Sequence, residues 1–273
     1  MACEDIAKRL ATLRSEKKEL EQLLPNLQGA GFQAVQANIA NKTEEIEVEQ
    51  DRLDECRALA EAAANPPPRR PFTARVKQIR CAAAGAEIGD QEPYLLIASV
   101  DRAPGFLSVP ALHCVLVGPW ADIRAGYTRF ADAGSPAFWD LDEDRKIVAD
   151  PQHVIFLIGV VENDGASPNA IRSLVQTSLL ASLAQNFQRD YDTLANTLAS
   201  AMTGAIDSFR GAGIGPGNAN FDDRVGVARL SLTDYDLDRI DALRAHEKAL
   251  TITGRNGSGD ITDQYTVTVS FAA

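Results

Sequence analysis

The spacing of apolar residues predicts helices in the first part of the chain. Over residues 4–64, apolar side chains recur at steps of three and four, as they do on one face of an α-helix. The segment 24–29 contains Pro25 and interrupts this spacing, so we expect an antiparallel helical hairpin or coiled coil within residues 1–65. Because each arm has an apolar face, the hairpin should pair its own arms, dock on the rest of the chain or meet other copies.

A proline-rich segment follows the helical part. Residues 66–71 (PPPRRP) cannot continue a helix, because consecutive prolines lack amide hydrogens and hold the backbone extended, so we expect a linker here. Over residues 72–273 the chain has short runs of β-branched and aromatic residues separated by Gly, Pro and Asp. Seven such runs favour an antiparallel β-sandwich: 74–81, 94–100, 112–117, 154–161, 225–232, 249–253 and 265–271.

One amphipathic segment interrupts the β-type runs. Residues 168–210 carry apolar side chains at steps of three and four, and Ser167 and Pro168 suit a helix start. The other face is rich in Ser, Thr, Gln, Asn and Ala and poor in charge. We expect a long helical insertion, or a helical pair bent near residues 190–192, with both faces partly buried. The alternative is a helix that leaves the body and inserts into a bilayer or a partner's groove.

Carboxylates cluster in three loops beside the β-type runs. The loops contain Asp90 and Glu92, Glu162 and Asp164, and Asp222 and Asp223. Hard cations such as Ca²⁺ prefer oxygen ligands, and clustered carboxylates repel one another unless a cation lies among them. The loops therefore predict a cation site. The alternative is a set of solvated acids, some of which cap turns.

The motifs in these loops resemble those of the C2 domain, the eight-stranded calcium-dependent membrane-binding sandwich. The segment EPY at 92–94 is similar to that family's Asp-Pro-Tyr, with Glu in place of Asp. Val160, Glu162 and Asp164 resemble its Val-x-Asp-x-Asp, and DDRVG at 222–226 resembles its Asp-Asp-Phe-Ile-Gly. The resemblance covers residues 72–273, with the helical insertion between the last two motifs. It implies convergence of six calcium ligands at one end of the sandwich: Asp90, Glu92, Glu162, Asp164, Asp222 and Asp223.

Composition narrows the class of protein. The chain has 27 Lys and Arg against 38 Asp and Glu, and this net charge of −11 argues against nucleic-acid binding, which needs clustered basic side chains. The four cysteines lack CxxC spacing, so we expect reduced thiols and neither a zinc site nor a disulfide framework. We find no secretory signal and no transmembrane stretch, and expect a cytoplasmic protein or one exported without a classical signal peptide.

The sequence favours binding over catalysis. Its three histidines, His113, His153 and His246, are accompanied by no nucleophile elbow, HExxH motif or Walker loop. We expect an α+β, non-enzymatic interaction module that contacts a membrane or protein partner through the acidic loops, with Ca²⁺ bound, or through the helical insertion. The hairpin would bind a protein partner or mediate self-association. The alternatives are a structural or assembly subunit without metal and a pore-forming or delivered effector, with a metal-dependent hydrolase last.

Overall fold

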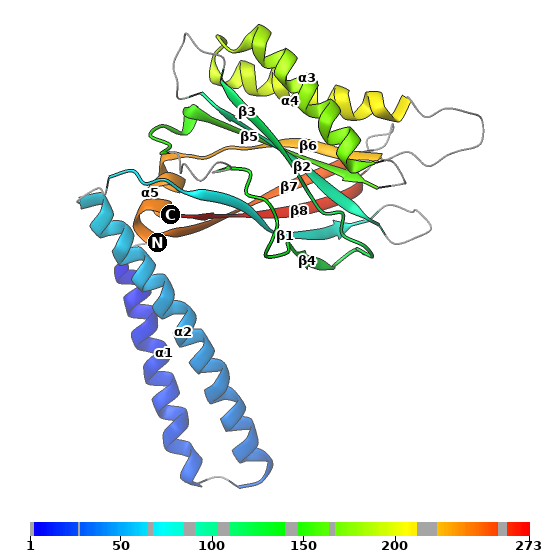
Figure 1. Ribbon diagram of the computed structural model, residues 1–273. Coiled ribbons are helices and arrows are strands. Elements are labelled where there is room, and N and C mark those ends of the chain that lie inside the picture. The colour runs from blue at the N-terminus through cyan, green and yellow to red at the C-terminus, as the bar shows by residue number, and fades with distance from the viewer. Residues whose placement is uncertain are drawn as a thin grey trace. The chain divides into compact units, whose positions relative to one another are not determined.

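The chain forms two compact units, Met1–Pro68 and Arg69–Ala273. The computed structural model describes residues 3–26, 28–64, 68–84, 91–102, 110–139, 147–163, 167–211, 223–255 and 261–273. The first unit is a pair of helices, and the second contains two antiparallel sheets with inserted helices (Figure 1). This confirms the predicted α+β architecture.

The first unit is an antiparallel helical hairpin. Helix α1 (Cys3–Leu23) leads through the short 3-10 helix η1 (Leu24–Asn26) and a turn to α2 (Ala30–Ala64). Gly29 in the turn has φ of 61°, a left-handed conformation that glycine adopts at little steric cost. The predicted break between the helices is therefore confirmed. A small set of side chains forms the buried core of the hairpin: Ile6, Leu10 and Leu53.

The second unit is a sandwich of two four-stranded antiparallel sheets. Their strand orders are β4-β1-β8-β7 and β3-β2-β5-β6. All seven predicted runs form strands, and the very short β4 is an addition. The strands are β1 (Thr73–Ala83), β2 (Pro93–Asp101), β3 (Ala111–Val117), β4 (Thr128–Phe130), β5 (Val154–Glu162), β6 (Asp223–Leu230), β7 (Ala245–Arg255) and β8 (Ile261–Ala272).

Burial along the strands shows how the layers pack. Strands β1 and β8 largely alternate buried with more exposed residues, because one face of their sheet lies on the core. Strands β2 and β5 are buried at every position. Their inward residues, such as Ile97 and Phe156, join the core between the sheets. Their outward residues, such as Leu96 and Leu157, belong to a second core beneath two helices.

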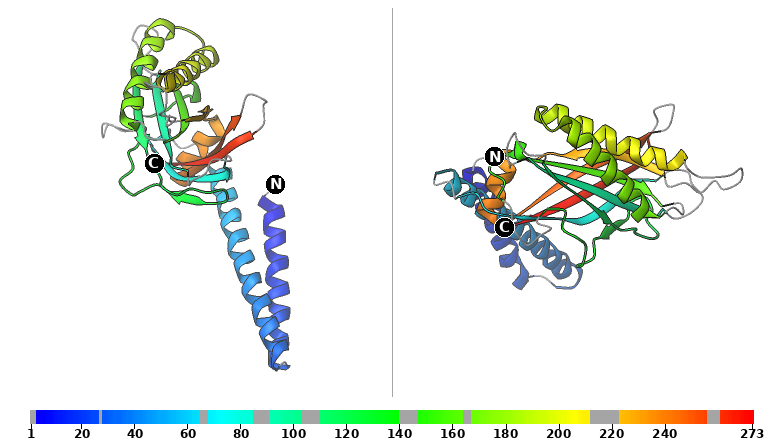
Figure 2. Two further views of the ribbon diagram at one scale, coloured as in Figure 1. Left: turned by 90° about the vertical axis from the view of Figure 1, so that its right-hand side faces the viewer. Right: turned by 45° about the horizontal axis from the view of Figure 1, so that its top comes forward.

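Helices α3 (Pro168–Asn186) and α4 (Tyr191–Gly211) cover the outer face of the β3-β2-β5-β6 sheet, as Figure 2 shows. The predicted insertion is thus a pair of helices. The Asp190 side chain accepts a hydrogen bond from the backbone N–H of Thr193 at the start of α4 (2.9 Å). The expectation of two partly buried faces is wrong for α3, whose outer positions, including Ser173 and Thr177, are exposed. Within the described ranges, no helix is long and apolar enough to span a membrane.

The C-terminal part contains one helix that was not predicted. Helix α5 (Asp234–Leu243) begins with a capping box in which Thr233 and Asp236 each bond the other's backbone N–H. Arg244 ends it in a left-handed conformation with φ of 62°. His246 follows this helix and lies in β7.

Candidate functional site

Strand pairing brings the three predicted acidic motifs to one end of the sandwich. Pro93, next to Glu92, lies opposite Glu162 in the β2–β5 pair, and Glu162 lies opposite Asp223 in the β5–β6 pair. The motifs therefore meet at three adjacent strand ends. Asp90, Asp164 and Asp222 lie outside the described residues, as does the side chain of Asp223. The convergence of all six carboxylates stays a prediction.

Glu92 is held by its neighbour across the strands. The Asn163 backbone N–H donates to the Glu92 carbonyl oxygen at 3.3 Å, and Asn163 Nδ2 donates to Glu92 Oε2 at 3.2 Å. The other end of the Asn163 amide, Oδ1, is buried and accepts no hydrogen bond from the described residues. Glu92 itself is exposed, so its carboxylate faces solvent beside the strand ends.

Glu162 turns into the protein instead of toward the loops. It is only 6% exposed, and the hydroxyl of Tyr265 on β8 donates to its Oε1. The same hydroxyl lies at hydrogen-bonding distance from Gln91 Oε1, and Gln91 Nε2 donates to Asp263 Oδ1 at 2.8 Å. Cys81 lies beside this group, with its Sγ 4.0 Å from Gln91 Oε1. A buried polar cluster thus links the two sheets at the strand ends next to Glu92 and Asn163.

The surroundings of this cluster keep the Tyr265 hydroxyl and the Cys81 thiol protonated. Burial raises the pKa of Tyr265, and the Coulombic effect and hydrogen bond of Glu162 raise it further. Burial also raises the pKa of the Cys81 thiol, although a hydrogen bond with Tyr265 lowers it in part. Among side chains that the structure describes, no group of three His, Cys, Asp or Glu residues is placed to hold a metal ion. The described polar side chains of this end are joined by hydrogen bonds among Tyr265, Glu162 and Gln91.

A second polar cluster joins α5 to β7. Asp236 is buried and accepts hydrogen bonds from His246 Nε2 (2.9 Å) and Lys248 Nζ (2.6 Å). Arg239 Nε donates to the other ring nitrogen of His246, Nδ1, at 3.2 Å. This places the ring proton on Nε2 and occupies both nitrogens, so neither is free to act as a general base. The cluster is structural, despite its Asp–His pair.

A polar hollow lies at the opposite end of the sandwich from the acidic loops. It has a volume of about 320 Å³, and its lining includes Asp150, Tyr191 and Asp192. The ring of Tyr191 is flanked by two guanidinium groups, Arg102 at 5.8 Å and Arg229 at 5.2 Å from the ring centroid. Burial raises the pKa of the Tyr191 hydroxyl. No pattern in the sequence predicts this hollow, because its residues come from separate chain segments without a shared motif.

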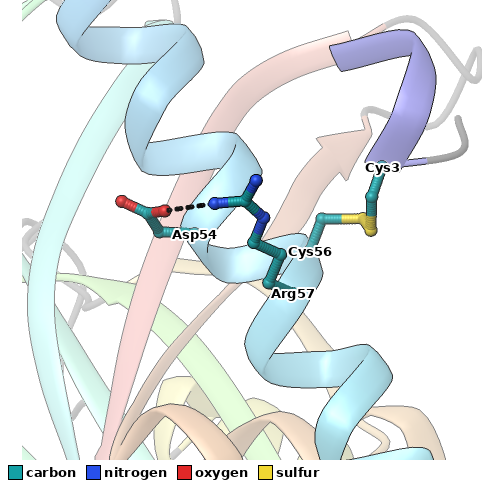
Figure 3. The surroundings of a disulfide bond; sticks show 4 residues. All are labelled: Cys3, Asp54, Cys56 and Arg57. Atoms are coloured by element: carbon teal, nitrogen blue, oxygen red, sulfur yellow. Dashed lines mark ion pairs between the residues drawn. A yellow bond between two sulfur atoms is a disulfide. The ribbon is translucent and has the colours of Figure 1, made fainter. Parts of the chain in front are cut away.

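A disulfide closes the hairpin at the end far from its turn. Cys3 and Cys56 are bonded across α1 and α2, with Cα atoms 5.7 Å apart (Figure 3). The ion pair of Asp54 with Arg57 lies next to it on α2, with 3.8 Å between Oδ1 and NH1. The expectation of reduced thiols is therefore wrong for these two cysteines. Cys81 and Cys114 are free and buried.

The register of the hairpin could have revealed the disulfide. Cys3 and Cys56 lie at almost equal distances along the chain from Gly29, on opposite sides of the turn. Antiparallel helices joined at that turn place such positions side by side. The CxxC rule considers only local spacing and cannot detect a pair brought together by a long hairpin.

A hollow of about 430 Å³ lies along the hairpin near the disulfide. Glu49 lines it and is only 3% exposed. Its Oε1 lies 3.3 Å from Arg9 Nε and 3.1 Å from Arg52 NH1. Its Oε2 is buried and accepts no hydrogen bond from the described residues. The hairpin thus buries a carboxylate that is only half satisfied.

Comparisons with known proteins give no family for this chain. No protein-family model matches it, and no curated protein matches it. A solved structure described by the words "CC2D1B coordinates ESRCT-III activity during the mitotic reformation of the nuclear envelope" matches with 9% sequence identity and a TM-score of 0.31. The match covers 99% of this chain and 88% of the other.

Proposed function

We propose that this protein is a non-enzymatic interaction module whose helical hairpin mediates assembly. The supporting observation is the uneven burial of the hairpin's apolar stripe. Near the disulfide, Ile6 and Leu10 are buried, but toward the turn Phe32, Val35 and Ile39 are only half-buried. Two helices alone leave this stripe partly in water.

The free energy of burial favours covering the stripe. Apolar surface removed from water contributes about 25 cal/mol per Å², and a pair of helices offers little of it. Coiled coils and bundles bury such stripes by adding helices, from the same chain type or from a partner. Self-association is the form of assembly that needs no further component, so we infer that the hairpin binds other copies of this chain.

Sedimentation of the full chain over a wide range of protein concentrations tests this proposal. We expect an oligomer whose association weakens when Phe32 and Ile39 are both changed to Asn. The matched control is Gln33→Asn, an exposed polar position on the same helix. Far-UV circular dichroism at each concentration confirms that the variants keep their helices. A wild-type chain that is monomeric at every concentration would overturn the proposal.

A second candidate function is calcium-dependent contact with a membrane or a protein through the acidic end, as in a C2-like domain. It is favoured by the strand register that places Glu92, Glu162 and Asp223 at adjacent strand ends. Ca²⁺ accepts six to eight oxygen ligands in flexible geometry, so Glu can replace Asp among them. A bound cation would also reverse the local sign of charge, which is what an anionic lipid surface requires.

Thermal unfolding of the metal-stripped protein with and without millimolar calcium tests the second candidate. Binding to the native state raises the unfolding midpoint by mass action. We expect calcium to raise the unfolding midpoint of the wild type. In a variant with Asp164, Asp222 and Asp223 replaced by Asn, calcium should leave the unfolding midpoint unchanged. An equal response in both proteins would place any calcium elsewhere. The absence of a response in either would exclude this function.

A further inference from the structure

The hollow on the hairpin combines charges of both signs with an exposed apolar side chain. Arg9 of α1 and Glu45, Glu49 and Arg52 of α2 line it. Val48 lies among them and is 48% exposed, although it is a large apolar residue on a helix. An apolar side chain flanked by charges of both signs is a surface on which another helix can pack.

Three of the residues that line the hollow form a separate stripe along α2. Glu45, Val48 and Arg52 are spaced by three and four residues, the spacing of neighbours on one helix face. The stripe that faces α1 is a different one and includes Ile46 and Leu53. Helix α2 therefore carries two adjacent seams, of which α1 covers only one.

Glu49 indicates that the hollow is incomplete in a single copy. A buried carboxylate oxygen without a hydrogen-bond donor costs free energy, and Glu49 Oε2 is in this situation among the described residues. Glu49 lines the hollow with its Oε2 closed off from water, so a donor carried by an occupant reaches this oxygen when the Glu49 side chain turns toward the hollow. Arginine is suited to this role, since its guanidinium group presents several N–H donors.

We propose that the occupant is α2 of a second copy of this chain, packed antiparallel about a two-fold axis near Val48. Glu45 lies about one helical turn before Val48, and Arg52 lies one turn after it. A two-fold axis near Val48 makes the two copies of α2 run in opposite directions. Arg52 of each copy therefore lies opposite Glu45 of the other. Such an interface is self-complementary, as two-fold interfaces must be. An occupant of a single charge sign would repel either Glu45 or Arg52.

This inference rests on the proposed function and adds a second contact surface, on a face of α2 other than the stripe of Phe32, Val35 and Ile39, through which two copies meet. Charge reversal tests it in the full chain. Glu45→Arg and Arg52→Glu each place like charges opposite one another twice in the interface, and we expect either variant to weaken dimerisation by roughly tenfold or more. An equimolar mixture of the two variants should recover the wild-type affinity, because every facing pair is then opposite in sign.

The mixture separates association from folding. Each variant loses a contact within its own hairpin, Lys42 with Glu45 in one and Glu49 with Arg52 in the other, and mixing does not restore these contacts. Recovery on mixing therefore reports only contacts between copies. Glu61→Arg, an exposed reversal further along α2, is the matched control and should leave the dimer unchanged.

Sedimentation equilibrium distinguishes the failure of this inference from the failure of the proposed function. A wild-type oligomer that is sensitive to the Phe32 and Ile39 variant but insensitive to both charge reversals would overturn this interface and leave assembly through the hairpin intact. Weakening by both reversals without recovery on mixing would also overturn the interface. A wild-type chain that stays monomeric would overturn both.

Discussion

The hydroxyl of Tyr265 on β8 donates a hydrogen bond to the carboxylate of Glu162 on β5, and this pair joins the two sheets of the sandwich at one end. Tyr265 is fully buried, and Gln91 Oε1 also lies at hydrogen-bonding distance from its hydroxyl. A tyrosine hydroxyl has a single proton to donate. The stability of this end therefore depends on one buried group with two polar partners.

Removing that hydroxyl should destabilise the sandwich. We expect Tyr265→Phe to lower the free energy of unfolding by about 1–3 kcal/mol, because Glu162 and Gln91 lose a buried partner without gaining water. Equilibrium urea unfolding measures the change. Tyr127→Phe, at a residue that is 50% exposed, is the control and should have little effect. Equal losses in the two variants would contradict the role of the cluster.

Asp236 should make the protein less stable in acid. Burial acts to raise the pKa of Asp236, but hydrogen bonds from Lys248, Thr233 and His246 outweigh it and hold the pKa below its usual value. A carboxylate with a lowered native pKa stabilises the fold above its unfolded pKa of about 3.9. This contribution is lost as the pH falls through the lower native pKa.

The pH dependence of urea unfolding below about pH 5 checks this prediction. In Asp236→Asn the free energy of unfolding should fall less steeply with decreasing pH than in the wild type. The free energy of unfolding of Asp236→Asn will still fall somewhat with decreasing pH, because hydrogen bonds from Thr193 also lower the pKa of the exposed Asp190. Identical slopes in the wild type and the variant would show that Asp236 contributes nothing to acid sensitivity.

The disulfide should stabilise the hairpin selectively. Cys3 and Cys56 are 53 residues apart in sequence, and closing a loop of this size contributes roughly 4 kcal/mol in the chain-entropy model. We expect a reducing agent to lower the unfolding midpoint of the helical signal at 222 nm. A Cys3→Ser, Cys56→Ser variant should have the lower midpoint with or without reductant. A wild type that does not respond to reductant would contradict this prediction.

The two free thiols should be inert in the native protein. Burial raises the pKa of Cys114 to about 12, with Arg172 offsetting part of the effect, and burial raises the pKa of Cys81 as well. Only the thiolate reacts readily with maleimides or disulfide reagents. We expect negligible labelling at neutral pH and rapid labelling of both in denaturant. Fast labelling of the folded protein would show that the core around the labelled cysteine opens readily, the core between the sheets for Cys81 and the core beneath the helices for Cys114.

Close packing should hold α4 against the sheet. A Cβ atom added at Gly159 on β5 would lie 2.8 Å from Met202 Cε on α4. We expect Gly159→Val to cost about 1–3 kcal/mol of stability through overpacking, and Met202→Ala combined with it to recover part of the loss. Gly204→Ala, at an open position on the same helix, should instead stabilise by about 0.5–1 kcal/mol. Urea unfolding distinguishes these outcomes, and a neutral Gly159→Val would show a loosely docked helix.

The secondary structure was largely readable because periodicity is a local property of the chain. The hairpin, seven strands and the amphipathic insertion follow from spacing alone. Strand β4 was missed because three residues, Thr128–Phe130, are too few to show alternation. Helix α5 was missed although its capping box, Thr233 with Asp236, was a usable signal.

The candidate site was predictable only in part. The sequence indicated that the loops of Glu92, Glu162 and Asp223 belong together, and the strand register places them at adjacent strand ends. It did not indicate that Glu162 turns inward to Tyr265. The partner of a side chain is decided by pairing between strands that are far apart in sequence, and the acidic motif is compatible with either orientation.

The sequence by itself determined which segments are helices and strands and that the protein divides into a hairpin and a β-rich body. Only the tertiary structure decided that β2 and β5 are buried on both faces, that Cys3 meets Cys56 and that Glu49 Oε2 has no donor among the described residues. The physical reason is the separation along the chain of the residues that determine each property. Helix and strand periods arise from neighbouring residues, whereas burial, disulfide pairing and hydrogen-bond satisfaction depend on which distant segments pack together.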